Sequence, residues 1–229
     1  MKIGGFQKVS LIDYPGRISA VVFTQGCNFR CPYCHNPELV DPERFAERVP
    51  EAEILAFLEK RKGRLDAVVI TGGEPTLQPE LVPFIIHLRA LGYPVKLDTN
   101  GSLPDVLEEL LGRKLLDYVA MDIKAPLEKY GETTRTSIDG ERIRRSIALI
   151  MGSGVDCEFR TTAVRSLLSP GDLEAIGRLV AGAKRFVLQK FVPTKTLDRG
   201  YLGEPSYSDG ELKALAEKLA PFVEKVTRR

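Results

Sequence analysis

Three cysteines within eight residues are the part of this sequence with the clearest chemical meaning. Cys27, Cys31 and Cys34 stand in the stretch TQGCNFRCPYCHN with the spacing C-x3-C-x2-C. Three soft thiolates can hold a soft metal centre. A [4Fe-4S] cube held by three cysteines keeps one iron without a protein ligand, and a substrate or cofactor can bind there. The same open position separates catalytic from structural zinc sites.

A zinc knuckle is the alternative, and it requires a fourth ligand. His35 and Cys157 are the obvious candidates. His35 directly follows Cys34, which is a poor geometry for sharing one tetrahedral metal ion. Cys157 lies in an apolar segment and is typical of a buried small residue. The spacing therefore favours the cluster over zinc.

Further candidate binding residues follow apolar, β-rich runs. Gly72, Gly73 and Glu74 follow the run AVVIT; strand-end glycines often mark the close approach of a ligand, and a carboxylate can accept from an ammonium group. Asp98 and Thr99 end the next run; Asp122 and Lys124 end the one after it. Arg160 lies inside the run FRTTAV, where a charge requires a partner.

The elements that position these residues alternate along the chain. We expect strands over residues 18–24, 66–71, 94–99, 118–123, 155–164 and 185–192, with helical patterns between them. Ser169 is expected to cap one helix and Ser208, with Glu211, the last one, which Pro221 kinks or ends. This order predicts an α/β fold: a partial (β/α)6 TIM-like barrel with a curved, open parallel sheet and outer helices. The motifs then lie at the carboxyl ends of strands, the catalytic face of barrel folds.

Length and composition set the class of protein. The chain has 229 residues, 43% of them apolar, and no linker of domain-boundary length, which predicts a single domain over residues 1–229. A net charge of +2 with interspersed acids and bases argues against a nucleic-acid partner. No apolar run approaches the ~20 residues that cross a bilayer, so no membrane partner is expected. With no secretory signal and three crowded cysteines, we expect a reducing, cytoplasmic location.

The cysteine loop, its flanks and the GGEP stretch together resemble the radical S-adenosylmethionine (SAM) superfamily. The resemblance implies that the open iron is chelated by the amino and carboxylate groups of SAM. It implies that GGEP binds the SAM amino group, and that Tyr33 and His35 contact the adenine, His35 largely through its backbone. The sites at Asp122, Lys124 and Arg160 are then candidates for holding the SAM ribose and carboxylate.

Within the superfamily the chain is similar to activating enzymes of glycyl radical enzymes. The similarity rests on three segments. The opening stretch GFQKVSLIDYPG resembles activating proteins of anaerobic ribonucleoside-triphosphate reductases, and the segments DTNG and DIK resemble the same group of enzymes. The resemblance implies a monovalent cation site at Asp98 and Thr99. Such relatives carry a His after the last strand that touches SAM; here Gln189 or Lys190 stands in its place.

The implied reaction uses an electron from flavodoxin or ferredoxin to cleave SAM reductively. The resulting 5′-deoxyadenosyl radical takes a hydrogen atom from a glycine of the partner, with an anaerobic ribonucleotide reductase as the first expectation. Residues 125–138 and 6–14 are expected to border the partner site. Two alternatives stay open: an enzyme similar to 7-carboxy-7-deazaguanine synthase acting on a small molecule, and a non-enzymatic iron–sulfur carrier or zinc module. The sequence does not name the glycyl radical enzyme, the electron donor or the oligomeric state.

Overall fold

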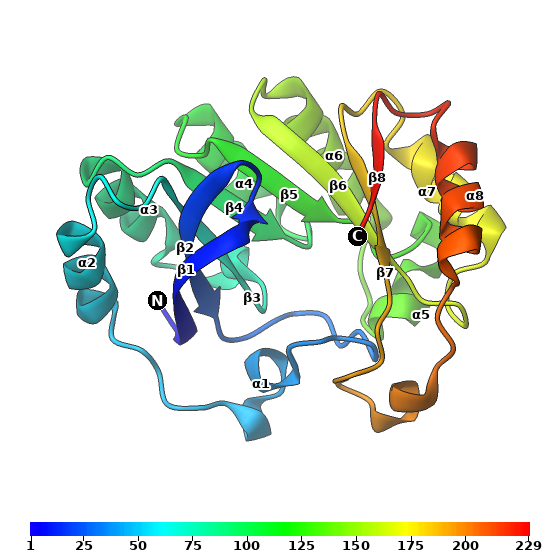
Figure 1. Cartoon of the computed structure of the whole chain (residues 1–229), viewed down its shortest axis with the longest axis horizontal. Helices are drawn as coiled ribbons and strands as arrows, with labels where there is room; N and C mark the ends of the chain where they lie inside the picture. The colour runs from blue at the N-terminus through cyan, green and yellow to red at the C-terminus, as the bar shows by residue number, and fades with distance from the viewer.

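A single curved sheet of eight strands runs through the computed structural model, which describes residues 1–229. The strands follow one another across the sheet in chain order, and the pairing ends at β1 and β8 without joining them, so the barrel is open (Figure 1). β1 pairs antiparallel with β2, and every other pair is parallel. The strands are β1 (Ile3–Tyr14), β2 (Arg17–Thr24), β3 (Ala67–Gly72), β4 (Val95–Thr99), β5 (Tyr118–Asp122), β6 (Asp156–Ala163), β7 (Phe186–Lys190) and β8 (Val226–Arg228).

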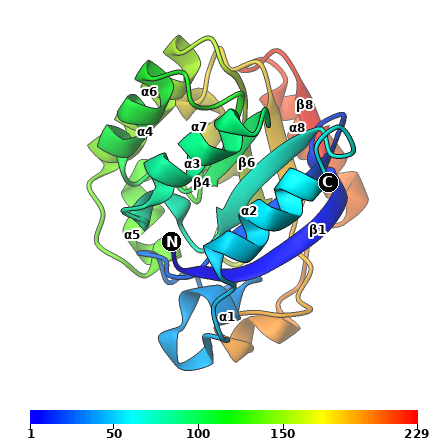
Figure 2. The same cartoon turned by 90° about the vertical axis from the view of Figure 1, so that its left-hand side faces the viewer.

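The helices lie in the connections between strands, and the longer ones cover the convex face of the sheet, whereas α1 lies at one end of the barrel (Figures 1 and 2). They are α1 (Pro37–Val40), α2 (Glu51–Lys60), α3 (Leu81–Ala90), α4 (Pro104–Gly112), α5 (Tyr130–Thr134), α6 (Gly140–Gly152), α7 (Pro170–Leu179) and α8 (Asp209–Leu219). Ser169 and Ser208 each form a capping box, as the sequence predicts, and α8 ends before Pro221. None of the helices combines the length and the apolar character needed to span a membrane.

Strand alternation divides the side chains between two environments. In β3, Val68 and Ile70 join the large core between the sheet and the helices. Val69, one position away, packs on the concave side in a small cluster that includes Val21 and Tyr118. The interior is apolar where these residues lie and becomes polar toward the carboxyl ends of the strands, where charged residues replace them.

The six predicted strands correspond to β2–β7, and the open barrel is confirmed. β1 and β8 were not predicted from the sequence. β1 joins β2 through a turn at Gly16, whose φ of 73° is in the left-handed region that favours glycine. β8 has three residues, too few for a periodic signal.

Residues 125–138, expected to border the partner site, are partly helical and partly buried. They contain a short 3₁₀ helix over Leu127–Lys129 and α5. Tyr130 is 1% exposed and its ring lies edge-on to Phe29, with the centroids 6.1 Å apart. The backbone N–H of Arg30 donates to the carbonyl of Thr134 at 2.8 Å. Much of this segment therefore supports the cysteine loop from below instead of projecting into solvent.

Candidate active site

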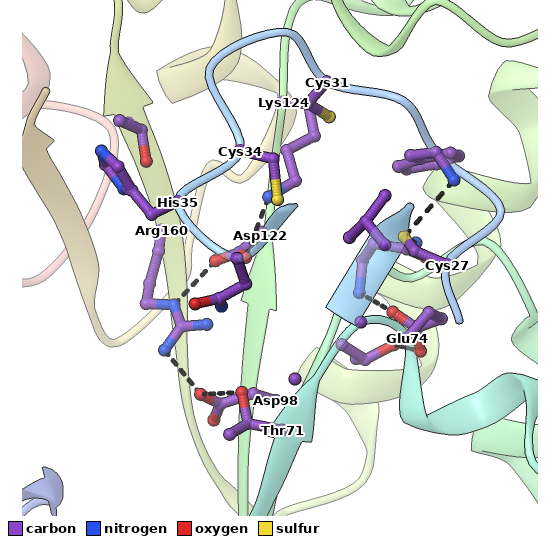
Figure 3. A pocket seen from close by; sticks show the side chains of 18 of the residues that line it. Cys27, Cys31, Cys34, His35, Thr71, Glu74, Asp98, Asp122, Lys124 and Arg160 are labelled. Carbon is purple, nitrogen blue, oxygen red and sulfur yellow. Dashed lines mark hydrogen bonds and ion pairs between the residues drawn. The ribbon is translucent and has the colours of Figure 1, made fainter. Parts of the chain in front are cut away.

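A pocket of about 260 Å³ lies at the carboxyl ends of the parallel strands. All thirteen residues predicted for the site line it (Figure 3): Cys27, Cys31, Tyr33, Cys34, His35, Gly72, Gly73, Glu74, Asp98, Thr99, Asp122, Lys124 and Arg160. They come from the loop after β2, from the ends of β3, β4 and β5, and from β6. Parallel strands bring these distant segments to one edge of the sheet.

The cysteine loop is held by its backbone, and its thiols are free. Gly26 turns the chain at the end of β2 with φ 97°, and its N–H donates to the carbonyl of Leu39 at 2.7 Å. None of the cysteines forms a disulfide. Burial raises the pKa of Cys27 to about 12, with a further contribution from the charge of Glu74, and burial raises the pKa of Cys31 to about 11. Metal binding at these thiols therefore releases protons.

The chemistry of the donors fits an iron–sulfur cluster. Cys27 Sγ accepts from the N–H of Phe29 at 3.4 Å and from Asn100 Nδ2 at 3.9 Å, and such bonds tune cluster thiolates. The buried hydroxyl of Tyr33 has no hydrogen-bond partner within the chain. No three His, Cys, Asp or Glu side chains are gathered to hold a single metal ion. Three thiols spread around one pocket suit a larger inorganic group.

The two candidates for a fourth zinc ligand are engaged elsewhere. His35 Nε2 lies 2.9 Å from the carbonyl oxygen of Val192, and its ring stacks on Phe191 at 5.5 Å between centroids. Cys157 is 7% exposed and packs in the large core. Because neither side chain turns toward the three thiols, the arrangement disfavours the zinc alternative.

Glu74 joins the loop after β3 to the loop after β4. Its carboxylate is fully buried; Oε1 accepts from the N–H and hydroxyl of Thr76 and from the Thr99 hydroxyl at 2.7 Å. Oε2 accepts from the N–H of Asn100 at 2.6 Å. Burial raises the pKa of Glu74, and these hydrogen bonds oppose the rise. Oε2 has one donor only and keeps capacity for the ammonium group that the sequence assigned to this carboxylate.

The two glycines before Glu74 are required by the protein's own backbone. A Cβ on Gly73 would lie 2.1 Å from the carbonyl oxygen of Gly26, and one on Gly72 would lie 2.4 Å from the N of Thr24. Gly72 also has φ 113°. Within the chain, the groups that approach them most closely belong to the end of β2 and the cysteine loop. The expected approach of a cofactor stays a prediction. The absence of a side chain at these glycines allows the loop after β3 to pack directly on the cysteine loop.

A chain of alternating charges crosses the concave face beneath the cysteines; Figure 3 shows its members Asp98, Arg160, Asp122 and Lys124. Lys96 Nζ lies 2.6 Å from Asp98, and Arg160 bridges Asp98 at 3.0 Å and Asp122 at 2.7 Å. Lys124 Nζ completes the chain at 3.0 Å from Asp122. Burial opposes ionisation of Asp98 and Asp122, but the neighbouring cations outweigh it and hold the pKa of both carboxyl groups below their usual range.

Sequence reasoning missed Lys96 and a small amide network. Lys96 interrupts the apolar run Val-Lys-Leu of β4, the same signal of a buried charge that marked Arg160, and it is 1% exposed. Asn28 accepts from Asn100 at 2.9 Å and donates to Ser102 at 2.8 Å, which links the cysteine loop to the loop after β4. Nothing in the spacing of these polar residues marked that contact.

The two residues expected in place of the missing His, Gln189 and Lys190, both lie in β7. Gln189 lines the pocket, whereas Lys190 pairs with Asp209 at 2.7 Å. Tyr33, predicted to contact an adenine, is 4% exposed, and its ring lies edge-on to Phe191 at 6.3 Å. Both aromatic residues beside Cys34 therefore pack on Phe191, directly after β7, and connect the cysteine loop to that segment.

A family model described as the radical SAM superfamily matches residues 21–174. The chain belongs to this superfamily. As a radical SAM protein it is an enzyme that uses a [4Fe-4S] cluster and SAM. Cys27, Cys31 and Cys34 would hold the cluster, and the pocket beside it would take SAM.

Individual relatives cover the chain to different extents. A Methanocaldococcus jannaschii protein provisionally named glycyl-radical enzyme activating enzyme is 37% identical over 99% of this chain and 95% of its own length. Pyruvate formate-lyase-activating enzyme of Clostridium pasteurianum is 38% identical over 54% of this chain, which spans about half (52%) of that enzyme. A 7-carboxy-7-deazaguanine synthase of Rhodospirillum rubrum is 42% identical over 39% of this chain and 37% of its own length.

Solved structures support the fold. Streptococcus suis SuiB superimposes with a TM-score of 0.70 over 91% of this chain and 48% of SuiB, at 16% identity. The structure of SuiB bound to SAM gives a TM-score of 0.68. At this identity the likeness concerns the partial barrel alone.

Proposed function

We propose that this radical SAM enzyme activates a glycyl radical enzyme. The observation that carries the proposal is the match along nearly the whole chain to a relative named for that activity. The similarity to pyruvate formate-lyase-activating enzyme agrees with it. With cluster and SAM bound, one electron and one SAM would give methionine, 5′-deoxyadenosine and a glycyl radical on the partner protein.

The chain's own residues would orient SAM for this reaction. Glu74 Oε2 offers an acceptor to the SAM ammonium, and Lys124, on the opposite side of the pocket, offers a cation to its carboxylate. Burial opposes the charge of Lys124, but Asp122 outweighs it and raises the pKa of Lys124, which therefore stays protonated. Gln189 can donate to the nucleoside part. A fixed set of charges holds the cofactor without rearrangement during turnover.

A second hollow suits a polypeptide substrate. It has a volume of about 490 Å³ and is lined by Ile12, Asp13, Lys96, Arg160, Gln189 and Arg229. It therefore lies at the open side of the barrel, between the β1 hairpin and the segment after β8, and shares Arg160 and Gln189 with the active site. A glycine-bearing loop inserted from this side would reach the SAM pocket.

The β1 hairpin provides an apolar rim for this opening. Val9, Leu11 and Ile12 are 53%, 72% and 82% exposed. Neighbouring exposed apolar side chains on a soluble surface often mark a protein contact. Of the two segments expected to border the partner, residues 6–14 have this character, whereas much of 125–138 is packed beneath the cysteine loop.

The first partner to test is an anaerobic ribonucleotide reductase, because the opening stretch of the chain resembles activating proteins of that enzyme. Flavodoxin or ferredoxin is the proposed electron donor. The reduced enzyme, SAM and the candidate partner are incubated anaerobically, and an electron paramagnetic resonance spectrum is recorded. A glycyl doublet, with one SAM consumed per radical, is the expected result.

A variant in the exposed apolar part of the β1 hairpin tests whether this surface binds the partner. Ile12→Glu should lower the radical yield on the partner while uncoupled SAM cleavage by the reduced enzyme continues. Ile86→Glu, at an exposed position of α3 on the outer layer, should change neither rate. If both variants behave alike, the hairpin is not the partner surface.

The partial similarity to 7-carboxy-7-deazaguanine synthase supports one competing function. It predicts catalytic turnover of a carboxy-tetrahydropterin in the presence of Mg²⁺. Turnover of that small molecule, with no doublet on any candidate glycyl radical enzyme, would decide for this alternative.

A further inference from the structure

Lys96 is a buried cation that the expected cofactor contacts do not use. It lies on β4 opposite Val69 of β3 and Tyr118 of β5, and its side chain is 2% exposed. Its ammonium nitrogen is 5.8 Å from the centroid of the Tyr118 ring. Lysine is almost never fully buried without a charged partner. Here that partner is Asp98, at 2.6 Å.

Asp98 has both of its oxygens engaged by the protein. Oδ1 accepts from Lys96, and Oδ2 accepts from Arg160 at 3.0 Å and from the Thr71 hydroxyl at 3.3 Å. The Thr99 hydroxyl donates to Glu74 and accepts from the N–H of Gly101 at 3.1 Å. At these two side chains, where the resemblance implies a monovalent cation site, the Asp98 oxygen with a single donor is Oδ1, and that donor is the Lys96 ammonium. A cation bound at Oδ1 would therefore lie next to a fixed one.

The carboxylates that line the SAM pocket already have as many cations beside them. Glu74, Asp98 and Asp122 line it with Lys124 and Arg160, and Lys96 adds a third cation from the adjoining hollow, which also contains Asp13 and Arg229. An added alkali ion would be a fourth cation next to two that already contact Asp98. An ammonium fixed to the strand supplies the same single charge without being taken from solution.

We propose that the Lys96 ammonium is a built-in replacement for a bound alkali cation at Asp98. As a positioning residue it holds Asp98, and Asp98 holds Arg160 between itself and Asp122 at the floor of the SAM pocket. The enzyme therefore binds and cleaves SAM without added K⁺ or Na⁺. The inference rests on SAM binding alone and is independent of the partner protein.

The experiment compares chloride salts of K⁺, Na⁺ and choline at equal ionic strength, with the cluster-loaded enzyme. The wild-type SAM dissociation constant, melting temperature and rate of 5′-deoxyadenosine formation should be the same in all three. Lys96→Met, which keeps the length and removes the charge, should bind SAM about tenfold more tightly in K⁺ or Na⁺ than in choline, within the usual range of such couplings. Lys62→Met, at an exposed position, is the control and should behave as wild type.

A double variant places the effect at Asp98. In Lys96→Met/Asp98→Asn the carboxylate that would attract the ion is also removed, so the dependence on K⁺ should disappear. Persistence of that dependence, or a folded Lys96→Met enzyme that ignores the salt, overturns the proposal. Loss of SAM affinity by the wild-type enzyme in choline overturns it as well, and this result does not require any variant to fold.

Discussion

Replacing Glu74 by Gln tests the hydrogen bonds by which this carboxylate joins the loop after β3 to the loop after β4. The glutamine oxygen, placed where Oε1 lies, can still accept from Thr76 and Thr99. Its NH₂ group then faces the N–H of Asn100, which now bonds Oε2 at 2.6 Å, so two donors oppose each other. The alternative rotamer puts the NH₂ group against the Thr76 N–H and is worse.

The magnitude follows from the bonds that change. A hydrogen bond to a charged group contributes about 1.5–3 kcal/mol, and a buried N–H left without an acceptor costs about 1–3 kcal/mol. Removing a buried charge offsets part of this loss, since burial already raises the pKa of Glu74. We therefore expect the free energy of unfolding to fall by about 2–4 kcal/mol. SAM affinity should fall too, because a neutral amide lacks the charge that attracts an ammonium group.

Urea unfolding followed by circular dichroism measures the first effect, and SAM titration of the cluster-loaded protein measures the second. Glu217→Gln, at an exposed position on α8, is the matched control. Iron analysis checks that both variants keep their cluster. A Glu74→Gln protein within about 0.5 kcal/mol of wild type, the range of ordinary surface changes, with unchanged SAM affinity would refute this account of the carboxylate.

Three further predictions concern the cluster, the loop contact and the response to pH. Cys31→Ala should abolish the four-iron content of anaerobically reconstituted protein, whereas Cys157→Ala should keep it; iron analysis and the absorption spectrum report both, and stoichiometric zinc without iron would contradict the assignment. Gly73→Ala should lower the melting temperature and SAM affinity together, because its Cβ would lie 2.1 Å from the Gly26 carbonyl oxygen and that backbone must shift; an unchanged melting temperature would count against the contact. The ion pair with an arginine and the capping bonds lower the pKa of Glu211 to about 2, so its contribution to stability is present above its ordinary pKa and disappears as the pH falls toward 2. The difference in unfolding midpoint between wild type and Glu211→Gln should therefore shrink below about pH 4.5, and a difference that grows with acidity would reverse the sign of this reasoning.

The sequence by itself determined the class of fold and the segments of the site. Six apolar runs separated by helical patterns predicted β2–β7. Most of the candidate site residues directly follow those runs. The reason is local: parallel strands buried on both faces consist of continuous apolar residues, so the point where such a run ends marks the edge of the sheet. The cysteine spacing is likewise a property of one short loop.

The tertiary structure decided which of these side chains contact one another. Asp122 and Arg160 face each other because β5 and β6 pair in one register, and that register is not encoded in either segment alone. The position of Lys96 against Asp98 and the hydrogen bonds from Asn100 and Thr99 to Glu74 follow from the same packing of distant strands.

The glycines before Glu74 illustrate the limit of reasoning from the sequence. Their position after β3 predicted the close approach of a ligand, and the structure adds a close approach of the backbone of Thr24 and Gly26 that the sequence did not indicate. The edge strand β1 was not predicted because its sequence lacks the signal of a buried strand. Much of β1 is exposed, so it lacks the apolar run of a central strand, and pairing with β2 holds it in place.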